Sequence, residues 1–436
     1  MKKFLAVLSI LLCFVSLNVF ANGSKETTVN EPVPLKFAIK ASEAGREVYK
    51  NLVNLAKENG IDVEIVSIPD PVAGQANKFL VSLMGGETFD MYLDAYANMS
   101  PFYEAGVVMN LEDLIAKTGY DVRGTFGEYP AEFDGEIYGL PAFVDTAVTL
   151  YNKDLFDRAG IPYPTAEDWT WEKYIEIASK ISELGEGIYG GYNPLWVHYN
   201  YMYALQKGAE HFKADGSANY DDPRFKEAVK FYYDLGNKYH AHPEYLVQKS
   251  KQMPLEYFTS GNVGMTVCGG WTTVWLMDHE KYPRDWKAGI LPMPHPEGEA
   301  PSTSVVISNF WIPTTSKQPE LAFKCIQLFA ENMYLLGGGK VPARIDLPQS
   351  EIDRYISEDL IGVLSADGIT VEDIAAAWFD PEVRPFPEKA TGPAAGDITK
   401  IFNAECGLYG IGEQDLDTTM KNIQEKVNKA ILDSKK

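Results

Sequence analysis

The sequence predicts an α/β protein with mainly parallel sheets flanked by helices, and three observations support this fold class. Segments with strand patterning alternate with segments of helical periodicity in the N-terminal part of the chain. The length of 436 residues allows two or three hydrophobic cores. A hydrophobic content of 45% is typical of a folded chain. Because strands that alternate with helices build parallel sheets, we expect ligands beyond the carboxyl ends of the strands.

The chain opens with the pattern of a cleaved secretory signal peptide over residues 1–21. Two lysines form a basic start, an apolar run follows over 4–14, and the small residue Ala21 ends the segment. Cys13 lacks the small preceding residue of a lipoprotein signal, so we expect no lipid anchor. The sequence therefore predicts a freely diffusing periplasmic protein.

A strand, a helix and a second strand follow in order. Residues 35–40 alternate as a strand does, and residues 43–58 have helical spacing. Asn59-Gly60 stops this helix, and residues 63–66 form the second strand. These elements predict a β-α-β unit at the start of the fold.

The alternation continues further along the chain. A helix around 75–83 stops at Gly85-Gly86, and residues 89–93 have the pattern of a third strand. Further helices are predicted over 171–184, 224–237, 320–333 and 418–432. The segment 290–301 is rich in proline and glycine, which predicts a connection that crosses the molecule.

The formal net charge of -22 argues against two classes of partner. Such an acidic chain repels phosphate backbones and anionic lipids, so neither nucleic acid nor a membrane surface is expected as the main partner. A small or neutral partner is favoured.

Local signatures of catalysis and metal binding are missing. The sequence has no GxSxG, HExxH or CxxC motif and no EF-hand loop. The glycine pattern over 185–190 follows a helix instead of a strand, so it predicts a turn and not a dinucleotide site. His240 and His242 are expected on the surface, and one ring of the pair Tyr232 and Tyr233 is expected to face water. We expect no metal and no cofactor.

Three cysteines remain after the predicted signal peptide, namely Cys268, Cys325 and Cys406. An odd number in an oxidising compartment permits at most one disulfide and leaves at least one thiol, which we expect to be buried. The sequence does not choose among the three pairings.

Several blocks share the pattern of one known family. They are residues 134–161 (DGEIYGLPAFVDTAVTLYNKDLFDRAGI), 258–265 (FTSGNVGM), Gly269-Gly270-Trp271, 286–294 and the turn 341–344. These blocks resemble the signatures of family 1 extracellular solute-binding proteins, the receptors of ABC importers, in the carbohydrate-binding group that includes maltose-binding protein. The region 375–412 departs from this pattern.

The resemblance implies a two-lobe periplasmic-binding-protein fold that closes on its ligand around a hinge. Lobe 1 would comprise residues 32–143 plus 304–348, and lobe 2 would comprise 146–302 plus 350–436. The protein would be a monomer that hands a sugar to the permease subunits of an ABC transporter, without catalysis.

Carboxylates near strand ends are candidate ligand contacts. Glu43 lies just beyond the first predicted strand, Asp94 just beyond the third, and Asp145 in the first crossing between the implied lobes. A carboxylate can accept hydrogen bonds from two hydroxyl groups, although each of these residues also suits a capping or surface position. Arg344 is a weaker candidate, since it also suits a salt bridge.

Aromatic rings are the second group of candidates, because the apolar face of a sugar stacks on a flat ring. Trp271 follows two glycines that leave room for close approach just after a strand. Trp196, His198 and Tyr199 stand at the predicted start of a helix, and Trp311 is either a platform or a core residue.

The leading hypothesis is thus a secreted receptor for a sugar or oligosaccharide. Two alternatives stay open. Acidic residues at strand ends favour a receptor for a polyamine or another cation. A secreted glycoside hydrolase would use two of the same carboxylates, whose separation in space the sequence does not give.

Overall fold

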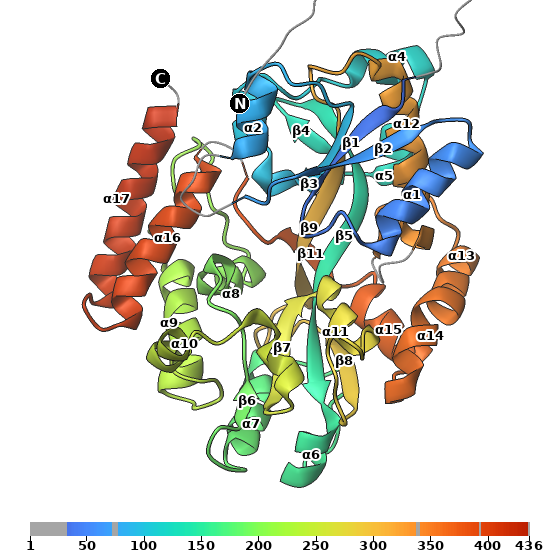
Figure 1. Ribbon diagram of the computed structural model, residues 1–436. Coiled ribbons are helices and arrows are strands. Elements are labelled where there is room, and N and C mark those ends of the chain that lie inside the picture. Colours follow the sequence, from blue (N-terminus) through green and yellow to red (C-terminus); the bar gives the residue numbers. More distant parts are fainter. Residues whose placement is uncertain (1–32, 72–76, 337–340, 392–393, 435–436) are drawn as a thin grey trace, which may run out of the picture. The chain divides into compact units, whose positions relative to one another are not determined.

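The computed structural model describes residues 33–71, 77–336, 341–391 and 394–434, and the account below concerns these residues (Figure 1). The predicted signal peptide over 1–21, with Cys13, lies outside them. Within the described ranges, no helix is both long enough and apolar enough to cross a membrane.

Strands and helices alternate through most of the chain, which confirms the predicted α/β class. The strands are β1 (Leu35–Lys40), β2 (Val63–Ile68), β3 (Met91–Ala95), β4 (Ala131–Phe133), β5 (Glu136–Asn152), β6 (Tyr189–Gly191), β7 (Val263–Gly269), β8 (Ala288–Pro292), β9 (Ser302–Trp311), β10 (Val341–Pro342) and β11 (Arg384–Pro387). The helices are α1 (Glu47–Glu58), α2 (Lys78–Met84), α3 (Ser100–Glu104), α4 (Glu112–Thr118), α5 (Val122–Phe126), α6 (Lys153–Ala159), α7 (Trp171–Ser182), α8 (Met202–Gln206), α9 (Pro223–Asn237), α10 (Tyr245–Lys251), α11 (Val274–Met277), α12 (Pro319–Asn332), α13 (Gln349–Arg354), α14 (Ile361–Leu364), α15 (Val371–Trp378), α16 (Ala395–Gly410) and α17 (Leu416–Ser434).

The strands are ordered β2-β1-β3-β9-β5-β7-β6 along the main path of the sheet. The predicted β-α-β unit is present, since β1 pairs in parallel with both β2 and β3. The strands β5 and β9 run antiparallel to each other through the centre of the path, as Figure 1 also shows. The sheet is therefore mixed, and the expectation of mainly parallel strands is corrected by these two long crossing strands.

Strand β5 changes partners along its 17 residues. Its segment 143–146 pairs with β9, whereas 147–151 pairs with β7 on one side and 148–152 with β8 on the other. This change of partner falls between Thr146 and Ala147, next to the boundary at 143–146 between the two implied lobes.

The buried apolar side chains form four clusters that divide along the chain. Two clusters combine residues 35–144 with residues 305–343. The other two combine residues 147–293 with residues 334–431. Each group brings together segments that are far apart in the sequence.

Helix α1 begins later than the sequence predicts, and this difference shapes the site described below. Its N-cap, Arg46, is extended, with φ -69° and ψ 144°, and the preceding residues form turns in which the amide of Glu43 donates to the carbonyl of Lys40. Glu43 therefore lies in a turn after β1 instead of in the first turn of a helix.

The expectation that one of Tyr232 and Tyr233 faces water is wrong, and the expectation of two surface histidines holds for the exposed His240 but not for His242. Tyr232 and Tyr233 are both buried, because α9 packs against segments on more than one side, and their hydroxyl groups donate to the carbonyls of Pro194 and Cys406. His242 is also buried, with its Nε2 atom 2.7 Å from the hydroxyl oxygen of Tyr174.

The three cysteines Cys268, Cys325 and Cys406 are free and buried, so none of them forms a disulfide. Burial raises the pKa of the Cys268 thiol to about 11. The expectation of a buried thiol is therefore confirmed, and these residues pack as small apolar side chains.

Candidate ligand-binding cavity

A cavity of about 880 Å³ lies at the carboxyl ends of β1, β3 and β7. Its wall is lined by Lys40, Ser42, Glu43, Arg46, Val48, Tyr49, Leu93, Asp94, Ala95, Asn98, Phe143, Asp145, Leu195, Trp196, Val197, His198, Trp271, Val274, Asp278, Lys281, Tyr282, Val306, Ser308, Met333, Tyr334, Glu388, Lys389, Thr399 and Asn403. This volume is near the upper end of the range of about 300 to 1,000 Å³ that is usual for small-molecule sites.

One side of the lining, called here the polar wall, consists of Lys40, Glu43, Asp94 and Asn98. These residues come from the ends of β1 and β3 and the turns that follow them. The ammonium nitrogen of Lys40 lies 2.7 Å from a carboxylate oxygen of Asp94, and that ion pair is mostly shielded from solvent. The Tyr49 hydroxyl donates to the Glu43 carboxylate over 2.5 Å. Burial, with the nearby Glu43 charge, raises the pKa of Tyr49, so this phenol stays a neutral donor.

The other side, called here the aromatic wall, consists of Trp196, His198 and Trp271. These rings belong to two short 3-10 helices, η2 (Val197–Asn200) with the residue before it, and η4 (Gly270–Thr273). The rings of Trp196 and Trp271 have centroids 6.1 Å apart and planes tilted by 40°. Both tryptophans are half-buried, which leaves part of each ring open to the cavity.

Two features of the backbone hold Trp271 in place. A Cβ atom on Gly269 would lie 2.7 Å from ring atoms of Trp271, so only glycine allows the indole to lie against the end of β7. The backbone amide of Trp271 donates to the Asp145 carboxylate over 2.9 Å. Asp145 therefore ties the end of β7 to β5 at the point where the aromatic wall begins.

His198 is buried in the aromatic wall, and burial lowers its pKa despite the opposing effect of the Glu388 charge. Its Nδ1 atom lies 3.4 Å from a carboxylate oxygen of Glu388, a residue that follows β11. The imidazole ring packs on Trp196 with a centroid distance of 5.6 Å. At neutral pH, this histidine is a neutral part of the wall.

The structure brings six of the nine predicted contact residues to the cavity. They are Glu43, Asp94, Asp145, Trp196, His198 and Trp271. They come from the end of β3, the turn after β1, the middle of β5 and the segments around η2 and η4, so the fold, and not local sequence, gathers them.

The other three predicted contacts, Tyr199, Trp311 and Arg344, do not appear in the cavity lining. The Tyr199 hydroxyl donates to the carbonyl of Val267, and its ring is stacked inside a core cluster. Trp311 is fully buried, and its indole N–H donates to the backbone carbonyl of Asp94. Arg344 forms an ion pair with Asp346.

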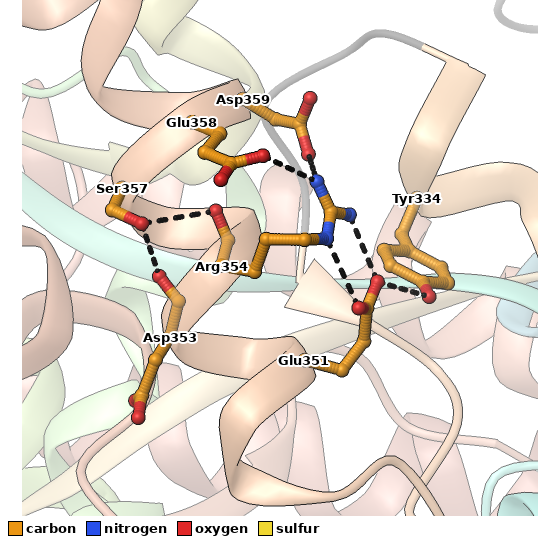
Figure 2. A network of polar contacts seen from close by, with 7 residues as sticks. All are labelled: Tyr334, Glu351, Asp353, Arg354, Ser357, Glu358 and Asp359. Carbon is orange, nitrogen blue, oxygen red and sulfur yellow. Dashed lines mark hydrogen bonds and ion pairs between the residues drawn. The ribbon is translucent and has the colours of Figure 1, made fainter.

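Sequence reasoning missed other lining residues, of which Tyr334 is the clearest example. Its hydroxyl donates to Glu351 over 3.1 Å, and Glu351 in turn accepts two hydrogen bonds from Arg354 (Figure 2). Tyr334 lies in a 3-10 turn after α12, and Glu351 lies in α13. No motif marks this contact, because it joins residues whose proximity depends on the fold. Lys40 was detectable in principle, since it ends the first predicted strand.

No group of three or more His, Cys, Asp or Glu residues within the described ranges has the geometry to hold a metal ion. The carboxylates of the polar wall are instead engaged by Lys40 and Tyr49. The lining as a whole suits noncovalent binding by stacking and hydrogen bonding.

Most of this chain is similar to known proteins. Residues 40–334 match the model of a family described as bacterial extracellular solute-binding proteins. A putative binding protein of Brucella abortus (strain 2308) is 26% identical over 388 residues, which cover 86% of this chain and 87% of that relative. The maltodextrin-binding protein MdxE of Bacillus subtilis (strain 168) is 21% identical over 351 residues, which cover 76% of this chain and 77% of MdxE.

The fold is also found among solved structures. An ABC substrate-binding protein of Listeria monocytogenes, solved in complex with cycloalternan, superimposes with a TM-score of 0.73 at 21% identity. The superposition covers 91% of this chain and 98% of that protein, which confirms the predicted fold class of the solute-binding receptors. Together with the family match over 40–334, it shows that this chain belongs to the bacterial extracellular solute-binding proteins, a family of binding proteins and not of enzymes.

Proposed function

We propose that this protein captures a sugar or oligosaccharide outside the cytoplasm and delivers it to the membrane permease of an ABC importer. The observation that carries the proposal is the cavity lining, which combines the half-buried rings of Trp196 and Trp271 with the hydrogen-bonding groups of the polar wall.

A sugar ring has the chemistry that such a cavity recognises. Its faces carry C–H groups that stack on aromatic rings, and its rim carries hydroxyl groups that donate and accept hydrogen bonds. Trp196 and Trp271 offer two adjacent ring faces, and Lys40, Asn98 and Glu43 offer donors and acceptors. The named ligands of the relatives, maltodextrin and cycloalternan, support the same class of compound.

Binding would proceed by closure of two lobes around the ligand, with no covalent step. We propose the lobe boundaries 32–143 plus 304–348 and 146–302 plus 350–436, with hinges near 143–146, 302–304 and 347–350. The division of the core clusters along the chain supports the boundaries near 143–146 and 302–304, whereas Tyr334 packs with lobe 2 residues although it lies within 304–348. Closure would add contacts that exist only in the bound state, which is how a ligand shifts such an equilibrium.

A polyamine or another cation suits this cavity less well than a neutral sugar does. Asp94 is already paired with Lys40, and the Asp145 carboxylate accepts from the backbone of Trp271. These partners already offset part of the negative charge that a bound cation would need, and the Lys40 ammonium would repel the cation. We therefore favour a receptor for a neutral sugar over a receptor for a cation.

We propose a soluble monomer in the periplasm as the working form. Its predicted signal peptide over 1–21 directs export, and the unsuitable context of Cys13 disfavours a lipid anchor. The net charge of -22 supports the absence of nucleic acid among its partners.

A thermal-shift panel on residues 22–436 tests the ligand class. The panel would contain monosaccharides, maltotriose, cellotriose, mannotriose, amino acids, spermidine and metal ions. A ligand at 100 times its Kd adds about 2.7 kcal/mol of stability, which should raise the midpoint by several degrees. A shift with sugars, recovered chemically unchanged, supports the proposal. A shift confined to spermidine or a metal ion contradicts it.

A further inference from the structure

We propose that Asp94 is a positioning residue, which holds the Lys40 ammonium and the Asn98 amide in the cavity so that these two groups contact the bound sugar. The nature of the ligand rests on the proposed function above. The positioning role itself rests on contacts that are present without a ligand.

The Asp94 carboxylate already accepts four hydrogen bonds. Its Oδ1 atom accepts from Lys40 Nζ at 2.7 Å and from Asn98 Nδ2 at 2.9 Å. The same oxygen accepts from the backbone amide of Ala95 at 2.8 Å, and Oδ2 accepts from the Tyr92 hydroxyl. An ionised carboxylate offers about four lone-pair sites. Three of these bonds fall on Oδ1, and Oδ2 keeps about one lone-pair site beside the Tyr92 bond, so it is the burial of the side chain that keeps Asp94 from a sugar hydroxyl.

Asp94 is more deeply buried than the two groups that it holds. Its side chain is 4% exposed, whereas the side chain of its ion-pair partner Lys40 is 20% exposed. Tyr92 is buried on the other side of the carboxylate, and burial together with the Asp94 charge raises the pKa of Tyr92. This phenol is therefore a fixed neutral donor that helps to orient the carboxylate.

Lys40 and Asn98 retain donors for a ligand. An ammonium group has three N–H donors, of which one is directed to Asp94. Asn98 is exposed at the end of the 3-10 turn η1 (Tyr96–Asn98) that follows β3. Both groups donate to oxygen acceptors, such as the hydroxyl or ring oxygens of a neutral sugar. A ligand amine at this end of the cavity would instead meet the Lys40 charge.

The chain supplies a matched control in Asp90, which immediately precedes β3. Asp90 is 7% exposed and Asp94 is 6% exposed. Asp90 accepts from the backbone amide of Lys36 at 2.9 Å and from the Ser316 hydroxyl at 2.6 Å. It does not line the cavity. Asp90→Asn therefore reports the general cost of neutralising a buried, hydrogen-bonded carboxylate in this region.

The first test needs no ligand. The purified protein is treated with a limiting amount of an amine-acetylating reagent, and peptide mass spectrometry gives the ratio of modification at Lys40 to modification at Lys57. Lys57 is an exposed lysine at the end of α1, so it serves as an internal reference. Asp94→Asn should raise this ratio severalfold, because the ammonium loses its partner, and Asp90→Asn should leave it unchanged. An unchanged ratio in Asp94→Asn would overturn the inference.

The second test measures Kd by calorimetry with whichever of maltotriose, cellotriose or mannotriose the wild-type protein binds. Asp94→Asn should weaken binding about tenfold or more, as expected when charge-assisted donors lose their orientation. In a Lys40→Met/Asn98→Ala background, Asp94→Asn should cause no further loss. A further tenfold loss in that background would mean that Asp94 itself contacts the sugar, against our inference. Asp90→Asn should keep the wild-type Kd.

The two tests separate the inference from the proposed function. If the wild-type protein binds neither these three sugars nor any monosaccharide of the panel, the proposed ligand class is in error. The acetylation ratio then still decides whether Asp94 positions Lys40.

Discussion

The two walls of the cavity are built by different physical means. In the polar wall, Lys40 and Asn98 are held by charge and hydrogen bonds that converge on Asp94. In the aromatic wall, Trp271 is held by close packing of its ring against Gly269 and by the hydrogen bond from its backbone amide to Asp145. The polar wall should therefore respond to changes of charge, whereas the aromatic wall should respond to changes of shape. Four measurements test this difference between the two walls.

Acid should destabilise the part of the chain that carries the aromatic wall, because all six histidines lie between residues 198 and 295. Burial lowers the pKa of His242 to about 3 and that of His211 to about 4, from an ordinary value of 6.5. The unfolded chain therefore binds more protons than the folded protein below pH 6.5. Stability is fully present above that pH and falls by about 1.4 kcal/mol per pH unit for each such histidine.

Urea unfolding at several pH values between 7 and 5 measures this slope. His242→Phe should lower the stability at pH 7, since it removes the bond to Tyr174, but it should make the decline toward pH 5 shallower. A slope that is the same in the variant and the wild-type protein would mean that His242 is not held neutral by burial.

Trp271→Ala should give the largest loss of sugar affinity, about a hundredfold, because it removes one of the two tryptophan platforms of the aromatic wall. The matched control is Trp286→Phe, which alters a buried tryptophan that packs on Phe258 and does not line this cavity. The control should lower the melting temperature and keep Kd, as measured by calorimetry. An unchanged Kd in Trp271→Ala would remove this ring from the proposed site.

Gly269→Ala should weaken sugar binding by about tenfold while it leaves every ligand-contacting side chain present. The added methyl group meets the Trp271 ring, which must then tilt or move, and off-rotamer side chains cost about 0.5 to 1.5 kcal/mol. Gly396→Ala is the control, because no atom beyond its chain neighbours and the nearby backbone of α16 lies within 4 Å of the added methyl group. Equal Kd values for the two variants would show that the position of the indole does not depend on Gly269.

Tyr334→Phe should have the smallest effect, a loss of affinity of about threefold. The ring stays in the lining, but it loses the hydrogen bond to Glu351 that fixes its orientation (Figure 2). Tyr163→Phe removes a similar bond to a carboxylate, Asp157, at an exposed site outside the cavity, and should leave Kd unchanged. A loss beyond tenfold in Tyr334→Phe would indicate that its hydroxyl contacts the sugar directly.

The sequence-based predictions succeeded where their evidence lay in residues that are close together in the sequence. The strand over 35–40 and the helix over 224–237 were predicted to within a residue or two, because hydrophobic periodicity is a property of neighbouring residues. Trp271 was identified because two glycines before a tryptophan are visible in the sequence. Helix α16, in the region 375–412 that fits no family pattern, was missed.

Burial of single residues was harder to predict, since it depends on what packs against an element from elsewhere. Tyr232 and Tyr233 are both buried because α9 has neighbours on more than one side. Trp311 and Arg344 were offered as ligand contacts on position and residue type alone. The structure gives both of them partners inside the protein, the Asp94 carbonyl and Asp346.

The α/β class, most of the helices and strands, and the family to which the chain is similar could be predicted from the amino-acid sequence, because they follow from local periodicity and from contiguous motifs. Which polar groups face the cavity, and which are already engaged, depends on the folded molecule. Lys40 and Asp94 are 54 positions apart, and their ion pair exists because parallel strands bring their ends to one edge of the sheet. A carboxylate is available to a ligand only where the protein has not already satisfied it, and that property belongs to the folded molecule.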